Sequence, residues 1–125
     1  RILIRAAVAE FYYGHTDVLV PAKSLVDDRS IVLAPTRTAH YVHLLFARHE
    51  MVFSEGLASE SLFTGTMALE ALGDEARAEL RGLVSETELA RMRLNRPALS
   101  VSEARALLHL ARNGQSASRT QSAAA

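Results

Sequence analysis

Residues 39–61 read AHYVHLLFARHEMVFSEGLASES and contain a prominent β-type run, residues 41–46. A polar break at residues 47–50 separates this run from the shorter apolar run 51–53, and Glu55-Gly56 ends the second run. Apolar and aromatic runs bounded by polar and glycine residues are typical of strands. The stretch therefore predicts a hairpin or a bent pair of strands.

Other β-type runs precede this stretch. They cover residues 2–8, 11–13, 18–20 and 30–33 and are separated by the turn residues 14–17, by Pro21 and by Pro35. We expect strands at these runs, because proline and clustered turn residues end extended segments. Residues 22–26 follow Pro21 and predict one helical turn.

The second half of the chain has helical spacing. A short helix is expected at residues 67–71, with Gly73 after its end, and a second helix follows Asp74. Ser85 and Ser100 are each followed three residues later by Glu, the pattern of a capping box, and Asn113-Gly114 ends the last apolar stripe. We therefore predict an α+β chain with a mainly β domain at residues 1–65. A helical extension packed on it covers residues 66–113, and a disordered tail covers residues 114–125.

Composition narrows the possible functions. The 125 residues match one domain, and 14 basic residues balance 14 acidic ones, so the formal net charge is zero. Neither the basic excess of a nucleic-acid binder nor a polybasic membrane segment is present. With no cysteine, the chain lacks disulfides, thiolate zinc ligands and a cysteine nucleophile. We expect no nucleic-acid or membrane partner.

Three of the five histidines, His40, His43 and His49, lie close together in the sequence. No Cys, Asp or Glu stands at a recognised ligand spacing from them, so we expect no metal and no cofactor. His49 and Glu50 are adjacent, and neighbouring residues of a strand face opposite sides, so they form no dyad with each other. Surface or hydrogen-bonded strand histidines remain the simplest interpretation of these residues.

The stretch 39–61 resembles the C-terminal conserved block of bacterial Hedgehog/intein (Hint) domains, in which a YxHLLFxxHEivfaEGxxSES-like sequence closes the fold. Residues 1–4 and 18–26 (RILI and VLVPAKSLV) are similar to the preceding part of that family, where a strand after a His-Arg pair leads to a "vlVpAr-Lv" segment. Residues 97–99 and 103–108 are similar to its tail helix. The resemblance extends over residues 1–112.

The resemblance implies self-processing chemistry. In Hint domains an N-terminal Cys or Ser attacks the preceding carbonyl, assisted by a Thr-x-x-His element, and both belong to the first half of the domain. We expect this chain to be the C-terminal half of such a domain, a fragment that begins within a strand and is inactive alone. By resemblance, His43 matches a position that tunes the nucleophile, and His49 matches the histidine before the last strands. An imidazole there can protonate a departing amide nitrogen, an effect of about 10²–10⁴ in rate.

Inteins end this block with His-Asn, and the Asn cyclises to cut the C-terminal junction. The equivalent positions here are Glu60 and Ser61, so we expect N-terminal cleavage or acyl transfer rather than splicing, with the parent polypeptide as substrate. We expect residues 66–112 to cover the strands without reaching the reaction centre. Two alternatives remain: a degenerate Hint-like structural or interaction module, and an unrelated α+β domain that binds a partner through its helices. Compartment and oligomeric state stay open.

Overall fold

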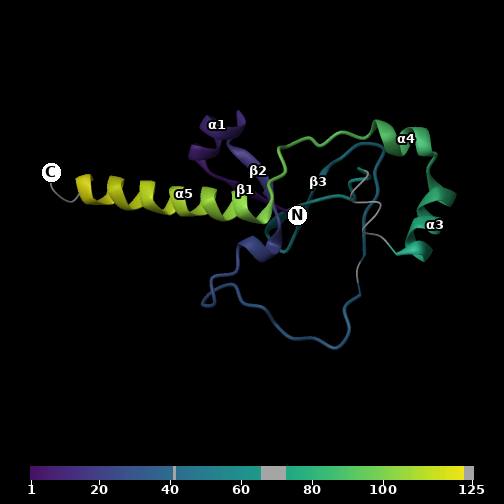
Figure 1. Ribbon diagram of the computed structural model, residues 1–125, viewed down its shortest axis with the longest axis horizontal. Coiled ribbons are helices and arrows are strands. Elements are labelled where there is room, and N and C mark those ends of the chain that lie inside the picture. Colours follow the sequence, from purple (N-terminus) through teal and green to yellow (C-terminus); the bar gives the residue numbers. More distant parts are fainter. Residues whose placement is uncertain (41, 66–72, 123–125) are drawn as a thin grey trace.

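A four-stranded antiparallel sheet joins the start of the chain to the stretch around residue 55 (Figure 1). β1 (Ile2–Arg5) pairs with β2 (Asp17–Val20) on one side and with β4 (Leu57–Glu60) on the other, and β4 pairs with β3 (Met51–Ser54). The strand order is β2-β1-β4-β3. The structure, a computed structural model, describes residues 1–40, 42–65 and 73–122. With its helices, mostly in the C-terminal half, this sheet confirms the α+β class.

The main core lies where β1 and β2 pack against helices. α1 (Ala7–Tyr13) connects these two strands, and the long helix α5 (Val101–Ser122) packs against α1 and against the 3-10 turn η1 (Ala22–Ser24). The buried members of the core are Ala9, Val18, Val20, Leu99, Ala104 and Leu107. In Figure 1, α5 continues well past the sheet toward the C-terminus. The last helix therefore supplies part of the core of the first strands.

Residues 97–99 cover the outer edge of β2. The backbone N–H of Leu19 donates to the Pro97 carbonyl at 2.8 Å, and the N–H of Leu99 donates to the Leu19 carbonyl at 2.8 Å. These bonds form a short parallel bridge between Leu19 and Ala98. An otherwise unpaired strand edge is thereby satisfied by the segment that leads into α5.

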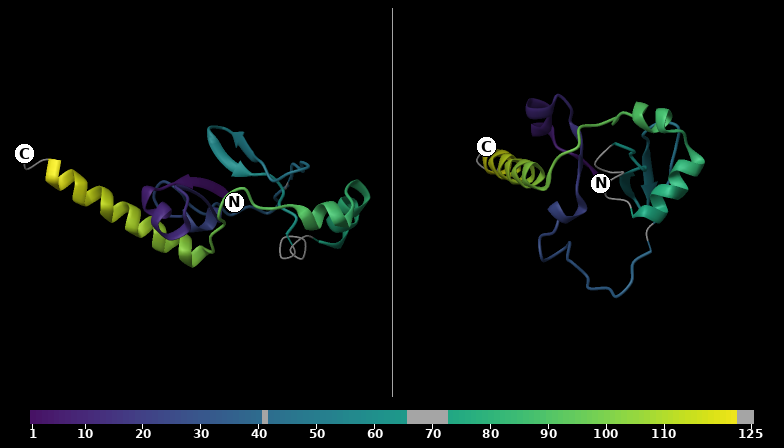
Figure 2. Two further views of the ribbon diagram at one scale, coloured as in Figure 1. Left: turned by 90° about the horizontal axis from the view of Figure 1, so that it is seen from above. Right: turned by 45° about the vertical axis from the view of Figure 1, so that its right-hand side comes forward.

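The β3–β4 hairpin turns through two residues. Ser54 pairs with Leu57, and the intervening Glu55 and Gly56 both have positive φ, 51° and 75°. Two consecutive positive φ angles define a type I′ turn, whose twist matches that of the paired strands. Figure 2 shows the hairpin standing out from the rest of the molecule. The predicted hairpin thus forms later in the sequence than expected, between residues 51–54 and 57–60.

Residues 11–13 belong to α1, so the strand predicted there is wrong. Ala9 and Tyr13 lie four residues apart and both pack in the core around β2, which is the spacing of a helix face. Gly14 adopts φ 70° and its N–H donates to the Glu10 carbonyl at 2.9 Å. The glycine thus ends a helix rather than opening a turn between strands.

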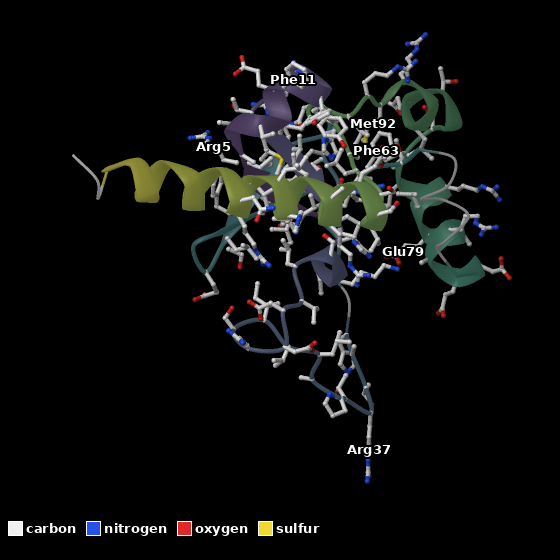
Figure 3. All side chains as sticks on the ribbon, turned by 60° about the vertical axis from the view of Figure 1, so that its left-hand side comes forward. Arg5, Phe11, Arg37, Phe63, Glu79 and Met92 are labelled. Carbon is white, nitrogen blue, oxygen red and sulfur yellow. The ribbon has the colours of Figure 1, made fainter. Side chains whose placement is uncertain are left out.

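Residues 25–50, apart from Tyr41, which lies outside the described residues, form a long loop without helix or strand. The strands predicted at 30–33 and 42–46 are therefore absent. Asp27 organises the start of the loop, because its Oδ1 accepts the backbone N–H groups of Arg29, Ser30 and Ile31. Residue Arg37 lies at the far tip of this loop (Figure 3).

The C-terminal helices match the sequence pattern closely. α3 (Asp74–Leu83) and α4 (Glu86–Arg91) form as expected, and reciprocal capping boxes join Ser85 to Glu88 and Ser100 to Glu103. The helix expected at residues 67–71 lies outside the described residues. α5 continues to Ser122, through most of the segment for which the composition predicts a disordered tail. None of the described helices is long and apolar enough to cross a membrane.

Candidate functional site around His49

His49 is buried beside the end of the hairpin, with 3% of its surface exposed. Because Met51 pairs with Glu60, the residues just before β3 lie next to the end of β4. The His49 Nε2 and Glu60 Oε2 atoms are 3.2 Å apart. A carboxylate oxygen only accepts hydrogen bonds, so His49 Nε2–H is the donor.

The Glu60 carboxylate also binds Arg1. The Arg1 guanidinium donates to both carboxylate oxygens, at 3.1 and 3.2 Å. Burial raises the pKa of Glu60, but the positive charge at Arg1 and the hydrogen bond from His49 act against it, and the pKa lies below its usual value. Glu60 is therefore an ionised acceptor shared by His49 and Arg1 at neutral pH.

Asn95, in the turn between α4 and α5, contacts the other side of the His49 ring. Its Oδ1 lies 3.0 Å from His49 Nδ1, and its backbone N–H points to the same nitrogen at 3.3 Å. The Asn95 side-chain amide also donates to the His49 carbonyl at 2.9 Å. The expectation that residues 66–112 do not reach the candidate site is therefore wrong for Asn95.

The surroundings of His49 are partly apolar and partly charged. The Phe63 ring meets the His49 ring edge to face, with centroids 5.6 Å apart. The Thr64 hydroxyl, one residue after Phe63, contacts the Met92 sulfur at 3.5 Å. An open cavity of about 630 Å³ lies nearby, and His49, Asn95, Arg48 and Arg91 are among the residues that line it.

His43 lies in a different environment. It is exposed in the long loop and lines a separate cavity of about 330 Å³ with Leu62 and with Glu79 and Leu80 of α3. No recorded contact within the described residues joins His43 to His49, and His40 is exposed. Of the three clustered histidines, only His49 forms a hydrogen-bonded site there.

The arrangement around His49 is suited to proton chemistry. Within residues 1–40, 42–65 and 73–122, no three His, Asp or Glu side chains are grouped to hold a metal ion. His49 pairs with an ionised carboxylate, which orients the imidazole. Since the His49 side chain has no exposed surface, it exchanges protons through the groups that contact it.

Sequence reasoning missed Glu60, Arg1 and Asn95 as site residues. A two-residue turn at Glu55-Gly56 pairs Met51 with Glu60. That pairing was the available signal for a contact between His49 and Glu60. Asn95 is 46 residues away from His49 and carries no local pattern that predicts the contact.

Most of the residues around His49 lie in a segment that matches a known protein family. A family model described as Hint domain matches residues 1–66, which is just over half of the 125 residues. The chain belongs to the Hint domain family, as the resemblance of residues 39–61 predicted. No curated protein and no solved structure matches the chain. The matched segment includes Arg1, His49 and Glu60 but not Asn95.

Proposed function

We propose that the chain is the C-terminal part of a Hint-type self-processing domain, in which His49 and Glu60 assist cleavage or an acyl shift at a peptide bond of the parent polypeptide. The observation that carries the proposal is the buried His49–Glu60 pair within the segment that matches the Hint family. A buried imidazole held by an ionised carboxylate is the kind of group that general acid catalysis requires.

The proposed step has a defined proton balance. A hydroxyl or thiol nucleophile loses its proton and forms a bond to the carbonyl carbon, the carbon–nitrogen bond breaks, and the departing amide nitrogen takes up a proton, so that the number of protons is unchanged. The chain has no cysteine, so in this proposal the nucleophile belongs to the N-terminal part of the domain. The second half contributes groups that orient side chains and supply the proton.

The position of Glu60 supports this division. Glu60 meets Arg1 at the beginning of β1, and its backbone N–H donates to the Arg1 carbonyl at 3.1 Å. The Hint family places a His-Arg pair immediately before the strand that residues 1–4 resemble. In the proposal, a histidine just before β1 lies near the end of β1 that contacts Glu60.

Exposed apolar side chains on the long loop and the hairpin also support the proposal that an N-terminal part of the domain packs against this chain. Large apolar residues seldom gather on the surface of a complete domain unless something covers them. Those that are at least 44% exposed on these segments are Ile31, Val32, Leu33, Val42, Leu44, Phe46, Phe53 and Leu57. In the proposal, the N-terminal part of the domain packs over them, and the exposed His43 faces that part.

The end of the conserved block favours cleavage or acyl transfer over splicing. Ser61 is buried, and its hydroxyl accepts the Glu50 backbone N–H at 2.9 Å, while its own backbone N–H donates to the Glu50 carbonyl. Neither Glu60 nor Ser61 carries the side-chain amide that asparagine cyclisation uses. We therefore propose that the C-terminal junction stays intact.

A fusion protein tests the proposal. The N-terminal half of an active Hint domain, with its nucleophile, is joined upstream of Arg1, and the products with added thiol are identified by mass spectrometry. We expect N-terminal cleavage that falls about 10²-fold or more in His49→Ala. The control variant His15→Ala, which changes an exposed histidine, should cleave normally. The chain without the fused half should give no cleavage product.

A degenerate Hint-like structural or interaction module is the alternative. It is favoured by one observation: both ring nitrogens of His49 already have hydrogen-bond partners within the chain, as in a purely structural histidine. A fusion that folds but shows no cleavage over prolonged incubation with thiol would support this module and contradict the self-processing function.

A further inference from the structure

We infer that Asn95, which lies outside the segment matched to the Hint family, is a positioning residue for His49 and supports a proton transfer at the His49 Nδ1 atom. The inference deepens the proposed function. Only the effect of Asn95 on peptide cleavage rests on that function; its effect on the protonation of His49 does not. Its basis is that Asn95 presents both a hydrogen-bond acceptor and a hydrogen-bond donor to the same ring nitrogen.

The orientation of the Asn95 side chain follows from its third contact. The His49 carbonyl only accepts hydrogen bonds, so the amide nitrogen of Asn95 must face it, at 2.9 Å. The Oδ1 atom of Asn95 then faces Nδ1, at 3.0 Å. The side chain is thereby fixed in the one orientation that places an acceptor on the ring.

The two protonation states of His49 use different atoms of Asn95. When the ring is neutral with its proton on Nε2, the bare Nδ1 accepts the Asn95 backbone N–H at 3.3 Å. When the ring is an imidazolium, Nδ1–H donates to Asn95 Oδ1. In both states Nε2–H remains donated to Glu60. The ring can therefore gain or lose one proton without breaking its contact with Glu60 and without leaving a ring nitrogen unsatisfied.

A route for this proton lies on the Asn95 side of the ring. The cavity of about 630 Å³ borders both His49 and Asn95 and is open to solvent. Glu60 on β4 contacts His49 and is itself bound by Arg1. The other charged groups near His49 line the cavity: Arg48, Glu50, Glu88, Arg91 and Arg93. The transfer balances with a hydronium ion from the cavity: its O–H bond breaks and leaves water, and an N–H bond forms at Nδ1. Because the ring has no exposed surface, this step needs the contact with Asn95 to open, and the reverse step returns the proton.

Nitrogen-15 NMR of the histidine rings in the 125-residue chain tests the inference. In the native chain, we expect neutral His49 to carry its proton on Nε2. Asn95→Ala keeps the backbone N–H but removes the acceptor, so the proton affinity of Nδ1 should fall about tenfold. Asn95→Asp replaces the amide with an anionic acceptor and should raise that affinity by a similar factor. The order Ala, Asn, Asp distinguishes positioning from a general loss of structure.

Asn113→Ala is the matched control. Asn113 contacts His109 with its side-chain amide nitrogen, at 3.0 Å, on the exposed face of α5, and its loss should leave the His49 signals unchanged. A native His49 with its neutral proton on Nδ1, or an unchanged titration of His49 in both folded Asn95 variants, would overturn the inference. The fusion assay tests the proposed function separately. If the NMR shows the expected order of Ala, Asn and Asp but the fusion gives no cleavage, the proposed function is contradicted and the role of Asn95 is retained.

Discussion

His49 Nε2 and Glu60 Oε2 lie 3.2 Å apart although eleven residues separate them in the sequence. The β3–β4 hairpin brings them together, because its register pairs Met51 with Glu60. Arg1 binds the same carboxylate from the start of β1. One ionised side chain thus connects three segments of the sheet, and the stability of this junction depends on pH.

Glu60→Gln should lower the free energy of unfolding at pH 7 by about 2 kcal/mol, since hydrogen bonds to a charged group are lost. The pKa of Glu60 is lowered in the folded chain, relative to an ordinary value of 4.5. Its contribution is therefore fully present above about pH 4.5 and is lost as the pH falls through the folded pKa. Urea denaturation between pH 3 and pH 7 should show the two proteins converging in acid. A constant difference across this range would contradict the assignment.

His49→Ala should cost about 2–4 kcal/mol of stability, because Glu60 and Asn95 lose a buried hydrogen-bond partner. The matched change His43→Ala removes an exposed imidazole and should alter stability by less than about 0.5 kcal/mol. Thermal and urea unfolding of the two variants measures the difference. Equal losses in both would show that His43 has a packing role in this chain.

Sequence patterns predicted the elements whose stability is local. Residues 2–5 and 17–20, both capping boxes and the helix after Asp74 form near their expected positions. The strand expected at 42–46 does not form, although its residues favour β structure. The Leu62 N–H donates to the Leu44 carbonyl, but within the described residues the segment joins no strand ladder, so its β propensity is not matched by backbone pairing.

The candidate site was harder to predict than the fold. His49 was identified through the family resemblance, but neither of its partners was assigned a role beside it. The contact with Glu60 depends on hairpin register, which a shift of one residue would destroy. The contact with Asn95 depends on how the turn after α4 returns to the sheet through the Leu19–Ala98 bridge. That tertiary arrangement has no local sequence signal.

Gly56→Ala should destabilise the hairpin by about 1–2 kcal/mol, because φ 75° is a left-handed conformation that a Cβ atom disfavours. No heavy atom lies within 4 Å of the added methyl group, so the cost is conformational and not steric. Gly82→Ala is the control, for which we expect the opposite sign. Gly82 is an exposed residue of helix α3, so its change to Ala should raise the free energy of unfolding by up to about 1 kcal/mol. Stabilisation by both changes would contradict the type I′ turn.

Leu107→Ala tests whether α5 is part of the core rather than an added helix. Leu107 is 2% exposed and packs in the cluster that contains Val18 and Val20 of β2, so truncation should cost about 2–5 kcal/mol. Leu110, on the same helix, is 42% exposed, and its change to Ala should cost less than about 0.5 kcal/mol. The same substitution at both positions leaves helix propensity equal, so the difference reports packing alone. Circular dichroism during thermal unfolding measures it. Similar small losses at both positions would show that β1, α1 and β2 are stable without α5, and that the residues after 100 are an extension of the domain.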